Sequence, residues 1–392
     1  TGGNDRQRKI SAIINLKMYK NLFFRFSANY NESNGFRENS FLNVNNTNKK
    51  NELFTRAKFF YNFDDSFNIL ATIIKASFDN GYDVWAPDNN EKFKTYSDDL
   101  GEDSQFTNAG SVKMNLQLNN NTRITSISSL SNTRLIHAYD GDWGNDSLWL
   151  QEHGFDPINE GYSYRFYDRN DRVRKNLAQE IRFLFRNNTF GLYYKKLKEE
   201  DDALGYLFGG LGDEAKAKYD FIAFAMYLQS QFDISKKIKF DINFRIEENK
   251  YNYTGETIDN YYYTDFPQVN FGKKDLMIGY KLAVSNNQSN VIKRFISYAR
   301  GYKAGGVNQQ PFLNNINRPY DPEYLDNFEL GLKIFKNKFS FVSTLFYGIR
   351  TDQQVSISAQ QDLGNPNSFY FFTGNTGEGK IYGSETDFYY NI

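Results

Sequence analysis

The segment Ile238–Glu247, IKFDINFRIE, alternates strictly between apolar and polar residues. Its apolar residues share one parity: Ile238, Phe240, Ile242, Phe244 and Ile246. Because successive side chains of a strand point to opposite faces, this period of two predicts a β-strand with one apolar and one polar face. A helix would instead scatter the intervening charged residues around its whole circumference.

The same alternation recurs along the whole chain. It is clear in Ser111–Asn119, in Leu22–Asn31 (where Phe23 is an exception) and in Phe328–Ile334. It predicts about sixteen strands, most of them about 10–13 residues long, which suits a tilted strand that crosses a bilayer. The predicted strands are 8–18, 22–32, 51–62, 67–78, 107–119, 122–137, 176–186, 189–199, 221–232, 238–249, 273–285, 291–302, 325–335, 339–351 and 379–392, with one more near 366–374.

The connections between these strands are alternately short and long. The short ones, rich in the Asn, Asp and Ser that turns favour, are 19–21, 64–66, 119–121, 187–188, 233–237, 286–290 and 336–338. The long ones are 33–50, 79–106, 138–175, 200–220, 250–272, 303–324 and 352–378. Short periplasmic turns and long extracellular loops in alternation are typical of an outer-membrane barrel. We therefore predict an all-β fold, an antiparallel transmembrane β-barrel, rather than a soluble β-protein.

The composition agrees with strands that have one apolar and one wet face. Aromatic residues make up 18% of the 392 residues, yet the mean hydropathy is −0.69. The longest apolar stretch, Phe221–Leu228, is far shorter than the roughly 18–20 residues that a transmembrane helix needs. The 47 basic and 47 acidic residues balance, which gives no support to nucleic-acid binding. Cysteine is absent, so the chain has neither disulfides nor thiolate metal ligands.

The two ends of the chain bear on its domain organisation. It begins at Thr1 without a signal peptide and ends at Ile392, inside the last predicted strand. We therefore expect residues 1–392 to be one barrel domain that is truncated at both ends.

Several stretches resemble the barrel domain of TonB-dependent transporters. SYARGYKAGGVN (Ser297–Asn308) is similar to the family's YARGYKSGGFN segment, and YDPEYLDNFELGLK (Tyr320–Lys333) is similar to its Y-x-PE…NYELGLK segment. FYGIRTDQQV (Phe346–Val355) resembles FY-x-x-x-x-D-Q-Q, and GNTGEGKIYGSE (Gly374–Glu385) resembles GNAG-x-x-x-x-G-x-E. Three earlier stretches also fit the family pattern: Asn21–Phe41, Asp79–Asn89 and Leu177–Phe183. The ordered set covers nearly the whole chain.

The resemblance implies a barrel of about 22 strands with a plugged lumen, in the outer membrane of a Gram-negative bacterium. About sixteen of these strands would lie in this chain, and the family's N-terminal plug and TonB box would not. The implied partners are the TonB–ExbB–ExbD complex, which pulls on the plug, and the surrounding outer-membrane lipid and lipopolysaccharide. The implied activity is energised import of a scarce, bulky nutrient. Ferric siderophore is the commonest cargo of the family; haem, cobalamin and glycans stay open, as does a passive porin.

The loop YDGDWGNDSLW (Tyr139–Trp149) is the first candidate for ligand binding. Its indoles could stack on a ligand, and its carboxylates could hold Ca²⁺, whereas a solvated loop with interfacial tryptophans is the plainer alternative. The candidate residues here are Asp140, Asp142, Trp143 and Trp149, together with Trp85 from another long loop. A second acidic run is either a cation site or an ordinary acidic loop: Asp98, Asp99, Glu102 and Asp103.

Further candidates lie in or near the other long loops. Arg165 and Arg169 begin a basic run, which also holds Arg172, Arg174 and Lys175. The run could attract anionic ligands or lipopolysaccharide phosphates, or it is simply the charged end of a loop. Tyr261 and Tyr262 could add an aromatic surface, or they are scattered loop tyrosines of the kind that aromatic-rich barrels carry. By the resemblance, three more residues match family positions near the outer mouth: Arg300, Lys303 and Asn308.

Catalysis has little support in the sequence. The only histidines are His137 and His153, and Ser147 is the one nearby nucleophile that an outer-membrane lipid hydrolase would use. No nucleophile-elbow pattern surrounds it. We therefore expect no catalytic residue, no resident metal and no cofactor.

Overall fold

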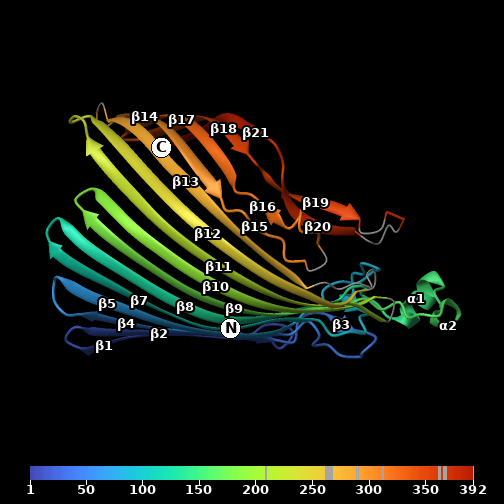
Figure 1. Ribbon diagram of the computed structural model, residues 1–392. Helices are drawn as coiled ribbons and strands as arrows, with labels where there is room; N and C mark the ends of the chain where they lie inside the picture. The colour runs from blue at the N-terminus through green and yellow to red at the C-terminus, as the bar shows by residue number, and fades with distance from the viewer. Residues whose placement is uncertain are drawn as a thin grey trace.

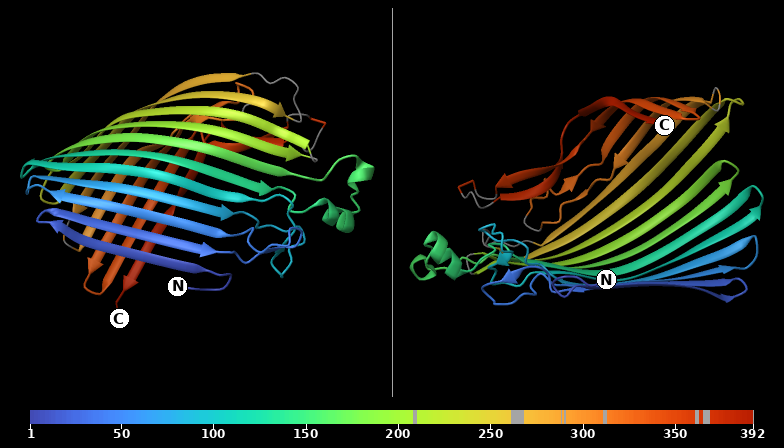
Figure 2. Two further views of the ribbon diagram at one scale, coloured as in Figure 1. Left: turned by 90° about the horizontal axis from the view of Figure 1, so that it is seen from below. Right: turned by 180° about the vertical axis from the view of Figure 1, so that it is seen from behind.

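A computed structural model describes residues 1–391 except 208–209, 261–267, 288, 290, 311–312, 361–362 and 365–368. One antiparallel sheet of fifteen strands dominates it, as Figures 1 and 2 show. In order across the sheet its strands are β1 (Arg8–Tyr19), β2 (Leu22–Ser33), β4 (Lys50–Asn62), β5 (Phe67–Gly81), β7 (Glu102–Asn119), β8 (Thr122–Asp140), β9 (Tyr167–Phe185), β10 (Asn188–Leu207), β11 (Gly210–Asp233), β12 (Ile238–Asn260), β13 (Val269–Asn287), β14 (Ile292–Lys303), β17 (Glu323–Lys336), β18 (Phe339–Thr351) and β21 (Gly379–Tyr390).

The remaining elements lie in the long connections, at one end of the sheet (Figure 1). They are β3 (Glu38–Asn39), β6 (Lys94–Thr95), α1 (Asp146–His153), α2 (Pro157–Glu160), β15 (Gly306–Val307), β16 (Pro319–Tyr320), β19 (Gln354–Gln360) and β20 (Phe369–Asn375). The short turns lie at the opposite end. Long and short connections therefore separate onto two ends, as the sequence predicts, and we call the first the loop end.

The strand register gathers apolar side chains on one face of the sheet. Phe244 of β12 lies opposite Leu228 of β11, which in turn lies opposite Phe190 of β10. These side chains are 42%, 41% and 44% exposed, so the face they share is not covered by protein. Since a slip of one residue would turn such a row to the other face, the apolar alternation itself specifies the register.

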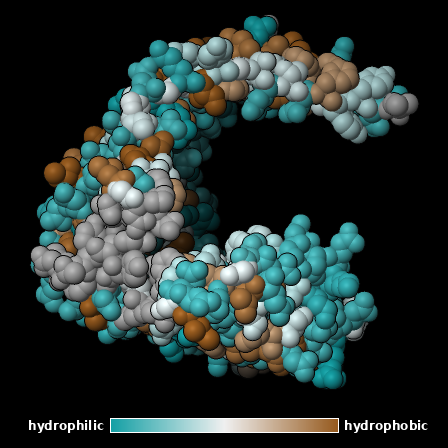
Figure 3. Space-filling view, turned by 90° about the vertical axis from the view of Figure 1, so that its right-hand side faces the viewer, coloured by the Kyte–Doolittle hydropathy of each residue, from teal (hydrophilic) through white to brown (hydrophobic). Residues whose placement is uncertain are grey.

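The opposite face is polar and lines a hollow. The Tyr227 hydroxyl of β11 donates to Glu180 of β9, 2.5 Å away, and Arg245 of β12 donates to the Tyr302 hydroxyl of β14 over 3.0 Å. Each of these contacts skips a strand, which side chains can do where a curved sheet brings them together on its concave side. Figure 3 shows the hollow around which the sheet curves. We call these two surfaces the concave face and the outer face.

The apolar part of the outer face covers only part of each long strand. On β12 the outer residues are apolar up to Ile246 and polar from Glu248 to Glu256, towards the loop end. The strands β9 to β13 thus extend beyond the apolar band. No helix in the described ranges is long and apolar enough to cross a membrane.

The structure corrects two predicted long loops. Residues 200–220 and 250–272 are largely strand: β10 and β11 stay paired up to Leu207 and Gly210, and β12 pairs with β13 from Ile238 to Gly255. In the extended parts the residues of the outer face are mostly polar, so the apolar outer row that marks the rest of each strand ends there. Backbone pairing continues nonetheless, with cross-strand ion pairs such as Lys216–Asp202, 3.9 Å apart.

The strand predicted near 366–374 also differs. β20 pairs with β19 in a separate two-stranded sheet and is not a member of the large sheet. The other fifteen predicted strands all lie in the large sheet.

Candidate functional site at the loop end

Two exposed indoles stack at the loop end. Trp85, from the β5–β7 connection, and Trp143, from the β8–β9 connection, have ring centroids 5.7 Å apart and an interplanar angle of 27°. Their side chains remain 56% and 38% exposed. Trp143 has a φ of 59°, a conformation that is uncommon for a bulky residue and that local hydrogen bonds must hold. The pair is therefore a pre-ordered aromatic surface open to solvent.

Asp140 and Asp142 hold the backbone beneath this pair. Asp140 Oδ1 accepts from the amides of Asp142 and Trp143 at 3.1 and 2.9 Å, and its Oδ2 accepts from the Asp98 amide at 3.1 Å. Asp142 Oδ1 accepts from the Gly144 amide at 2.8 Å, and its Oδ2 accepts from the Phe166 amide at 2.9 Å. Both residues are buried, so their carboxylates organise the loops from inside.

Burial makes these carboxyl groups weaker acids than ordinary aspartates. It raises the pKa of Asp140 to about 8, with a further contribution from the nearby Asp142 carboxylate. Burial also raises the pKa of Asp142 itself. The pKa of Asp98 rises to about 6 because of burial and of repulsion from Asp99. Within the described ranges, no three His, Cys, Asp or Glu side chains are placed to hold a metal ion. The carboxylates of Asp140 and Asp142 accept backbone hydrogen bonds.

Trp149 lies on α1, which the sequence did not predict. Asn145 caps the start of this helix by accepting from the Leu148 amide, and Gly154, with φ 69°, ends it. The Trp149 indole nitrogen donates to Asp142 over 3.3 Å, and its ring packs against His153 at 5.1 Å. The histidine of the hypothetical lipid hydrolase thus stacks on a tryptophan, while Ser147 lies six residues earlier on the same helix.

The four arginines of the predicted basic run are paired with acids. Arg165 makes a bidentate contact with Asp99, at 2.7 and 2.6 Å, and Arg169 donates to Glu102 at 3.0 Å. The following arginines do likewise on the concave face: Arg172 with Asp201 and Glu199, and Arg174 with Glu199. These pairs join the loop to neighbouring strands and locally neutralise the cations.

A second group of loops packs on the concave face of β12 and β13 at the loop end. We call it the lid, and its described part consists of residues 304–310 and 313–322, with β15 and β16, together with the strands β19 and β20. Asn308 joins its two parts, since its amide donates to Thr373 O at 2.8 Å and accepts from the Thr373 amide at 2.9 Å. Val307 of the lid packs against Tyr251 and Tyr253 of β12 in a small buried cluster.

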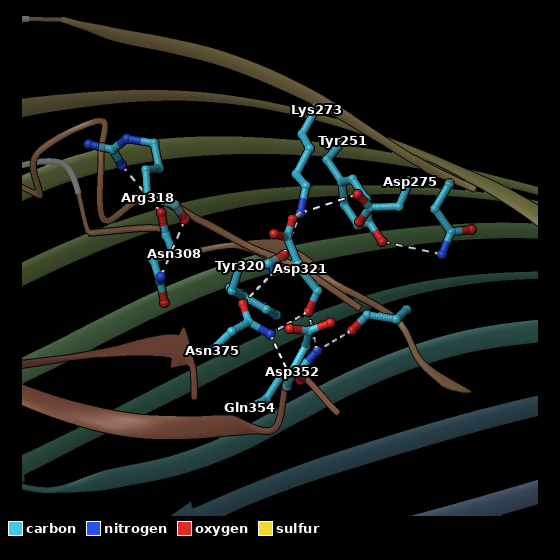
Figure 4. Close-up of polar contacts among 12 residues, drawn as sticks. Tyr251, Lys273, Asp275, Asn308, Arg318, Tyr320, Asp321, Asp352, Gln354 and Asn375 are labelled. Atoms are coloured by element: carbon cyan, nitrogen blue, oxygen red, sulfur yellow. Dashed lines mark hydrogen bonds and ion pairs between the residues drawn. The ribbon is translucent and has the colours of Figure 1, made fainter. Parts of the chain in front are cut away.

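Arg318 ties the lid together from within, as Figure 4 shows in part. It is fully buried, and its guanidinium donates to the carbonyls of Asn308 and Gln310 at 3.2 and 2.9 Å and to that of Leu313. The same group lies 5.1 Å from the ring centroid of Tyr253. Arg318 therefore cross-links the lid internally and packs it against β12.

Lys273 of β13 anchors the lid to the sheet (Figure 4). Its ammonium lies 3.2 Å from Asp275 on the same strand and 2.8 Å from Asp321 of the lid, and it also donates to Tyr320 O. Asn375 of the hairpin extends the contact, because its amide donates to Asp321 O at 2.9 Å. The strand β13, the 313–322 segment of the lid and the strand β20 are thus linked through Lys273 and Asp321.

The remaining candidate residues lie apart from the indole pair. Arg300 makes a bidentate contact with Asp326, which lies opposite it on β17. On the same two strands, Tyr298 lies opposite Phe328. Lys303 is exposed at the end of β14. Tyr261 and Tyr262 lie outside the described residues. The structure thus brings together Trp85, Asp140, Asp142, Trp143, Trp149 and Arg165, and places Asn308 separately in the lid.

Lys273 and Arg318 are residues that sequence reasoning missed. Lys273 stands in a run, GKKD, that reads as a polar loop, and Arg318 follows an Asn-rich stretch and precedes Pro319. Neither pattern signals burial. Only the tertiary contacts between connections far apart in the chain select them.

The comparisons with known proteins agree with this architecture. Residues 20–391 match the family model described as TonB dependent receptor-like, beta-barrel. The ferric yersiniabactin uptake receptor FyuA from Yersinia pestis is similar with a TM-score of 0.72 and 13% identity, over 98% of this chain and 56% of that one. The ferric-catecholate import receptor Fiu from E. coli K12 has a TM-score of 0.68 and 13% identity, over 100% of this chain and 61% of that one.

Another structure, the copper transporter OprC, has a TM-score of 0.63 and 9% identity, over 99% of this chain and 57% of that one. At these identities the likeness concerns the fold. The chain spans 56–61% of the length of these structural relatives. No curated protein sequence matches it. Since the family model matches almost the entire chain, this protein belongs to the family of TonB-dependent receptor β-barrels.

Proposed function

We propose that this chain forms the barrel wall of a Gram-negative outer-membrane transporter that imports a ferric siderophore in a TonB-dependent manner. The family is that of TonB-dependent transporters, which are not enzymes.

The single observation that carries the cargo proposal is the Trp85–Trp143 stack at the loop end. Two indoles held 5.7 Å apart and open to solvent offer flat apolar faces to a ligand that contains aromatic or other planar groups. The hydrogen bonds of Asp140 and Asp142 hold the loop before any ligand arrives. Pre-ordering lowers the entropy lost on binding, which favours tight capture of a dilute nutrient.

The polar concave face supports a hydrated path through the sheet. Between the loop end and the turns it carries hydrogen-bonded polar and charged groups such as Glu180, Arg182 and Tyr227, with Arg182 donating to Glu180 at 2.7 Å. Its charges are largely paired, so a large chelate would make many weak contacts along the path and would not bind tightly at one point. The apolar outer face supports a location in a membrane.

The named siderophore receptors with this fold make an iron chelate the first cargo to test. FyuA is a ferric yersiniabactin uptake receptor, and Fiu is a ferric-catecholate import receptor. The proposed energy source is the TonB–ExbB–ExbD complex, which would act through a plug segment of the full-length protein. The proposed lipid environment is the outer membrane with its lipopolysaccharide.

Growth of a strain that lacks the full-length gene tests this proposal. We expect a growth defect only when accessible iron is withheld, and we expect free ferrous iron to remove it. A strain whose growth does not depend on the gene under iron starvation would contradict the siderophore cargo. Cobalamin, haem and oligosaccharides would then be screened with the same strain.

A further inference from the structure

The two connections that carry the indole pair are strongly acidic. Residues 82–101 and 141–166 together hold ten Asp or Glu residues but only three Lys or Arg residues, which leaves them a formal charge of −7. The whole chain, in contrast, has 47 acidic and 47 basic residues. A chain without net charge thus concentrates negative charge in the loops around Trp85 and Trp143.

The few cations of these connections already have carboxylate partners. Arg165 makes its bidentate contact with Asp99, and its guanidinium also lies 5.2 Å from the ring centroid of Tyr206. The ammonium of Lys94 lies 3.0 Å from Glu38, which belongs to the β2–β4 connection. Two of the three cations are therefore engaged in ion pairs of their own, and the excess of acidic residues remains.

Acids of both connections meet beneath the Trp143 backbone. The Asp98 amide donates to Asp140 at 3.1 Å, and Asp140 also accepts from the Trp143 amide at 2.9 Å. The Asp98 carboxylate lies within electrostatic reach of Asp142 and Asp146. Burial raises the pKa of Asp98 to about 6, so this group is still largely ionised at neutral pH. Negative charge therefore lies directly under one of the two indoles.

Two exposed acids add charge beside the same surface. Asp88 follows Trp85 by three residues and accepts from the Tyr96 hydroxyl at 2.8 Å. Burial and the Asp88 carboxylate raise the pKa of Tyr96 to about 12, and Glu152 of α1 adds to this shift. Tyr96 thus has two exposed carboxylates near it, one from each of the connections that the indole stack joins.

We propose that these acidic loops make the Trp85–Trp143 pair selective for aromatic ferric chelates that carry no net negative charge. An indole face stacks on planar rings of any charge, whereas the field of the surrounding carboxylates repels an anion as it approaches. Specificity of this kind comes from making the wrong ligand unfavourable, in addition to attracting the right one. The selectivity rests on the proposed function, because it names the class of chelate that the same indole pair would take.

Ferric chelates with similar aromatic groups differ widely in charge. Three monoanionic hydroxamates balance Fe³⁺, so a ferric tris(benzohydroxamate) is uncharged. Three dianionic catecholates exceed the charge of Fe³⁺, so a ferric tris(catecholate) is a trianion. Both offer aromatic rings for stacking on an indole. One pair of like charges separated by about 10 Å repels only weakly in water, but a trianion would face several carboxylates at once and the contributions add.

The test measures the Kd of these two chelates, each synthesised as a single hexadentate ligand, for the full-length protein in an uncharged detergent. The ionic strength is about 10 mM, where the Debye length is about 30 Å. The variant removes three loop acids through Asp88→Asn, Asp98→Asn and Glu152→Gln. The matched control removes three exposed acids at the short-turn end through Asp65→Asn, Asp233→Asn and Asp387→Asn.

We expect the wild type and the control to bind the uncharged chelate at least about tenfold more tightly than the trianion. The loop variant should bind the trianion at least about tenfold more tightly than the wild type does, and the uncharged chelate within about twofold of the wild type. Raising the ionic strength to about 1 M, where the Debye length is about 3 Å, should reduce the preference of the wild type. A trianion that binds the wild type as tightly as the uncharged chelate would overturn the proposal, and so would an unchanged preference in the loop variant.

Binding of the uncharged chelate separates this selectivity from the proposed cargo. Its retention by the loop variant shows that the indole pair is still folded, and Trp143→Ala should weaken the binding of both chelates. If both chelates bind the wild type equally well, the ferric cargo stands and only the charge selectivity fails. If neither chelate binds the wild type, the indole pair takes no aromatic ferric chelate, and the selectivity and the role of the pair in the proposed function fail together.

Discussion

The indole of Trp85 stacks on the indole of Trp143 with the ring centroids 5.7 Å apart, although the two residues come from different connections of the sheet. The contact joins the β5–β7 loop to the β8–β9 loop. It leaves an aromatic face open to solvent. This relationship links the fold to the proposed capture of a ligand, and it can be tested directly.

Replacing Trp143 with Ala should weaken capture of the cargo. The variant loses one stacking surface and the partner that orients Trp85, and a stacked aromatic contact contributes about 0.5–1.5 kcal/mol. We therefore expect the concentration for half-maximal uptake to rise by about twofold to tenfold. This concentration is measured from the uptake of a labelled ferric siderophore by cells that carry the full-length variant. The control is Tyr382→Ala, which disrupts the stacked Tyr347–Tyr382 pair of the outer face and should leave uptake unchanged.

Replacing Lys273 with Met should release the lid from the strand wall. The side chains of Lys273 and Asp275 are only 13% and 6% exposed, so the variant leaves a buried carboxylate without its cation. Breaking such a pair destabilises by about 3–5 kcal/mol. Hydrogen exchange of backbone amides in 304–310 and 313–321 should accelerate. Lys303→Met removes an exposed lysine near the same loop and should leave the exchange unchanged; equal acceleration in both variants would contradict the anchor.

Gly305→Ala should disturb the same contact by crowding it. A Cβ at Gly305 would lie 2.5 Å from Asp275 Oδ2 and 2.6 Å from Tyr320 O, too close for either atom to stay in place. A Cβ at Gly301 would meet nothing within 4 Å. Overpacking of this kind destabilises by about 1–3 kcal/mol, whereas Gly301→Ala should change stability by less than about 0.5 kcal/mol. Thermal unfolding of the two variants in detergent compares them, and equal melting temperatures would refute the close packing.

The loops around the indole pair should become more stable as the pH falls from 9 to 5. Burial raises the pKa of Asp140 to about 8 and that of Asp98 to about 6, above the ordinary value of 3.8. The folded loops therefore bind protons that the unfolded chain releases, and their stability declines as the pH rises through these values. Proteolysis within 141–166 should accordingly be severalfold slower at pH 5.5 than at pH 9.

Asp98→Asn supplies the control for this pH dependence. Asp98 Oδ1 is buried without a hydrogen-bond partner, so the neutral amide removes a repelling charge and breaks no side-chain contact of that oxygen. We expect slower proteolysis at pH 9 and a flatter pH profile than in the wild type. An unchanged profile would show that the carboxyl groups are not responsible.

The large sheet could be predicted from sequence because its strands face two different environments. Segments such as Ile238–Glu247 keep strict alternation where one side of the strand is apolar and the other polar. The prediction failed where the outer side of the strands becomes polar. Residues 250–260 continue β12 with Thr254 and Glu256 on the outer face, so the hydropathy pattern looks like a loop although pairing with β13 runs on to Gly255.

The candidate site was only partly predictable for a related reason. Aromatic and acidic residues in a long loop suggested Trp143 and Asp142 as binding residues, but their contacts depend on a second loop distant in sequence. Asp142 is buried beneath the indoles, where it accepts backbone hydrogen bonds. Lys273 and Arg318 could not be found because a lysine or arginine in a polar stretch gives no sign that it will be buried.

Uptake of an iron-labelled siderophore by cells that express the full-length protein as their sole receptor tests the central claim most directly. We predict saturable uptake that disappears when the gene for TonB is deleted and returns when it is restored. Uptake that stays linear with concentration and persists without TonB would contradict the account, because it would identify the protein as a passive pore.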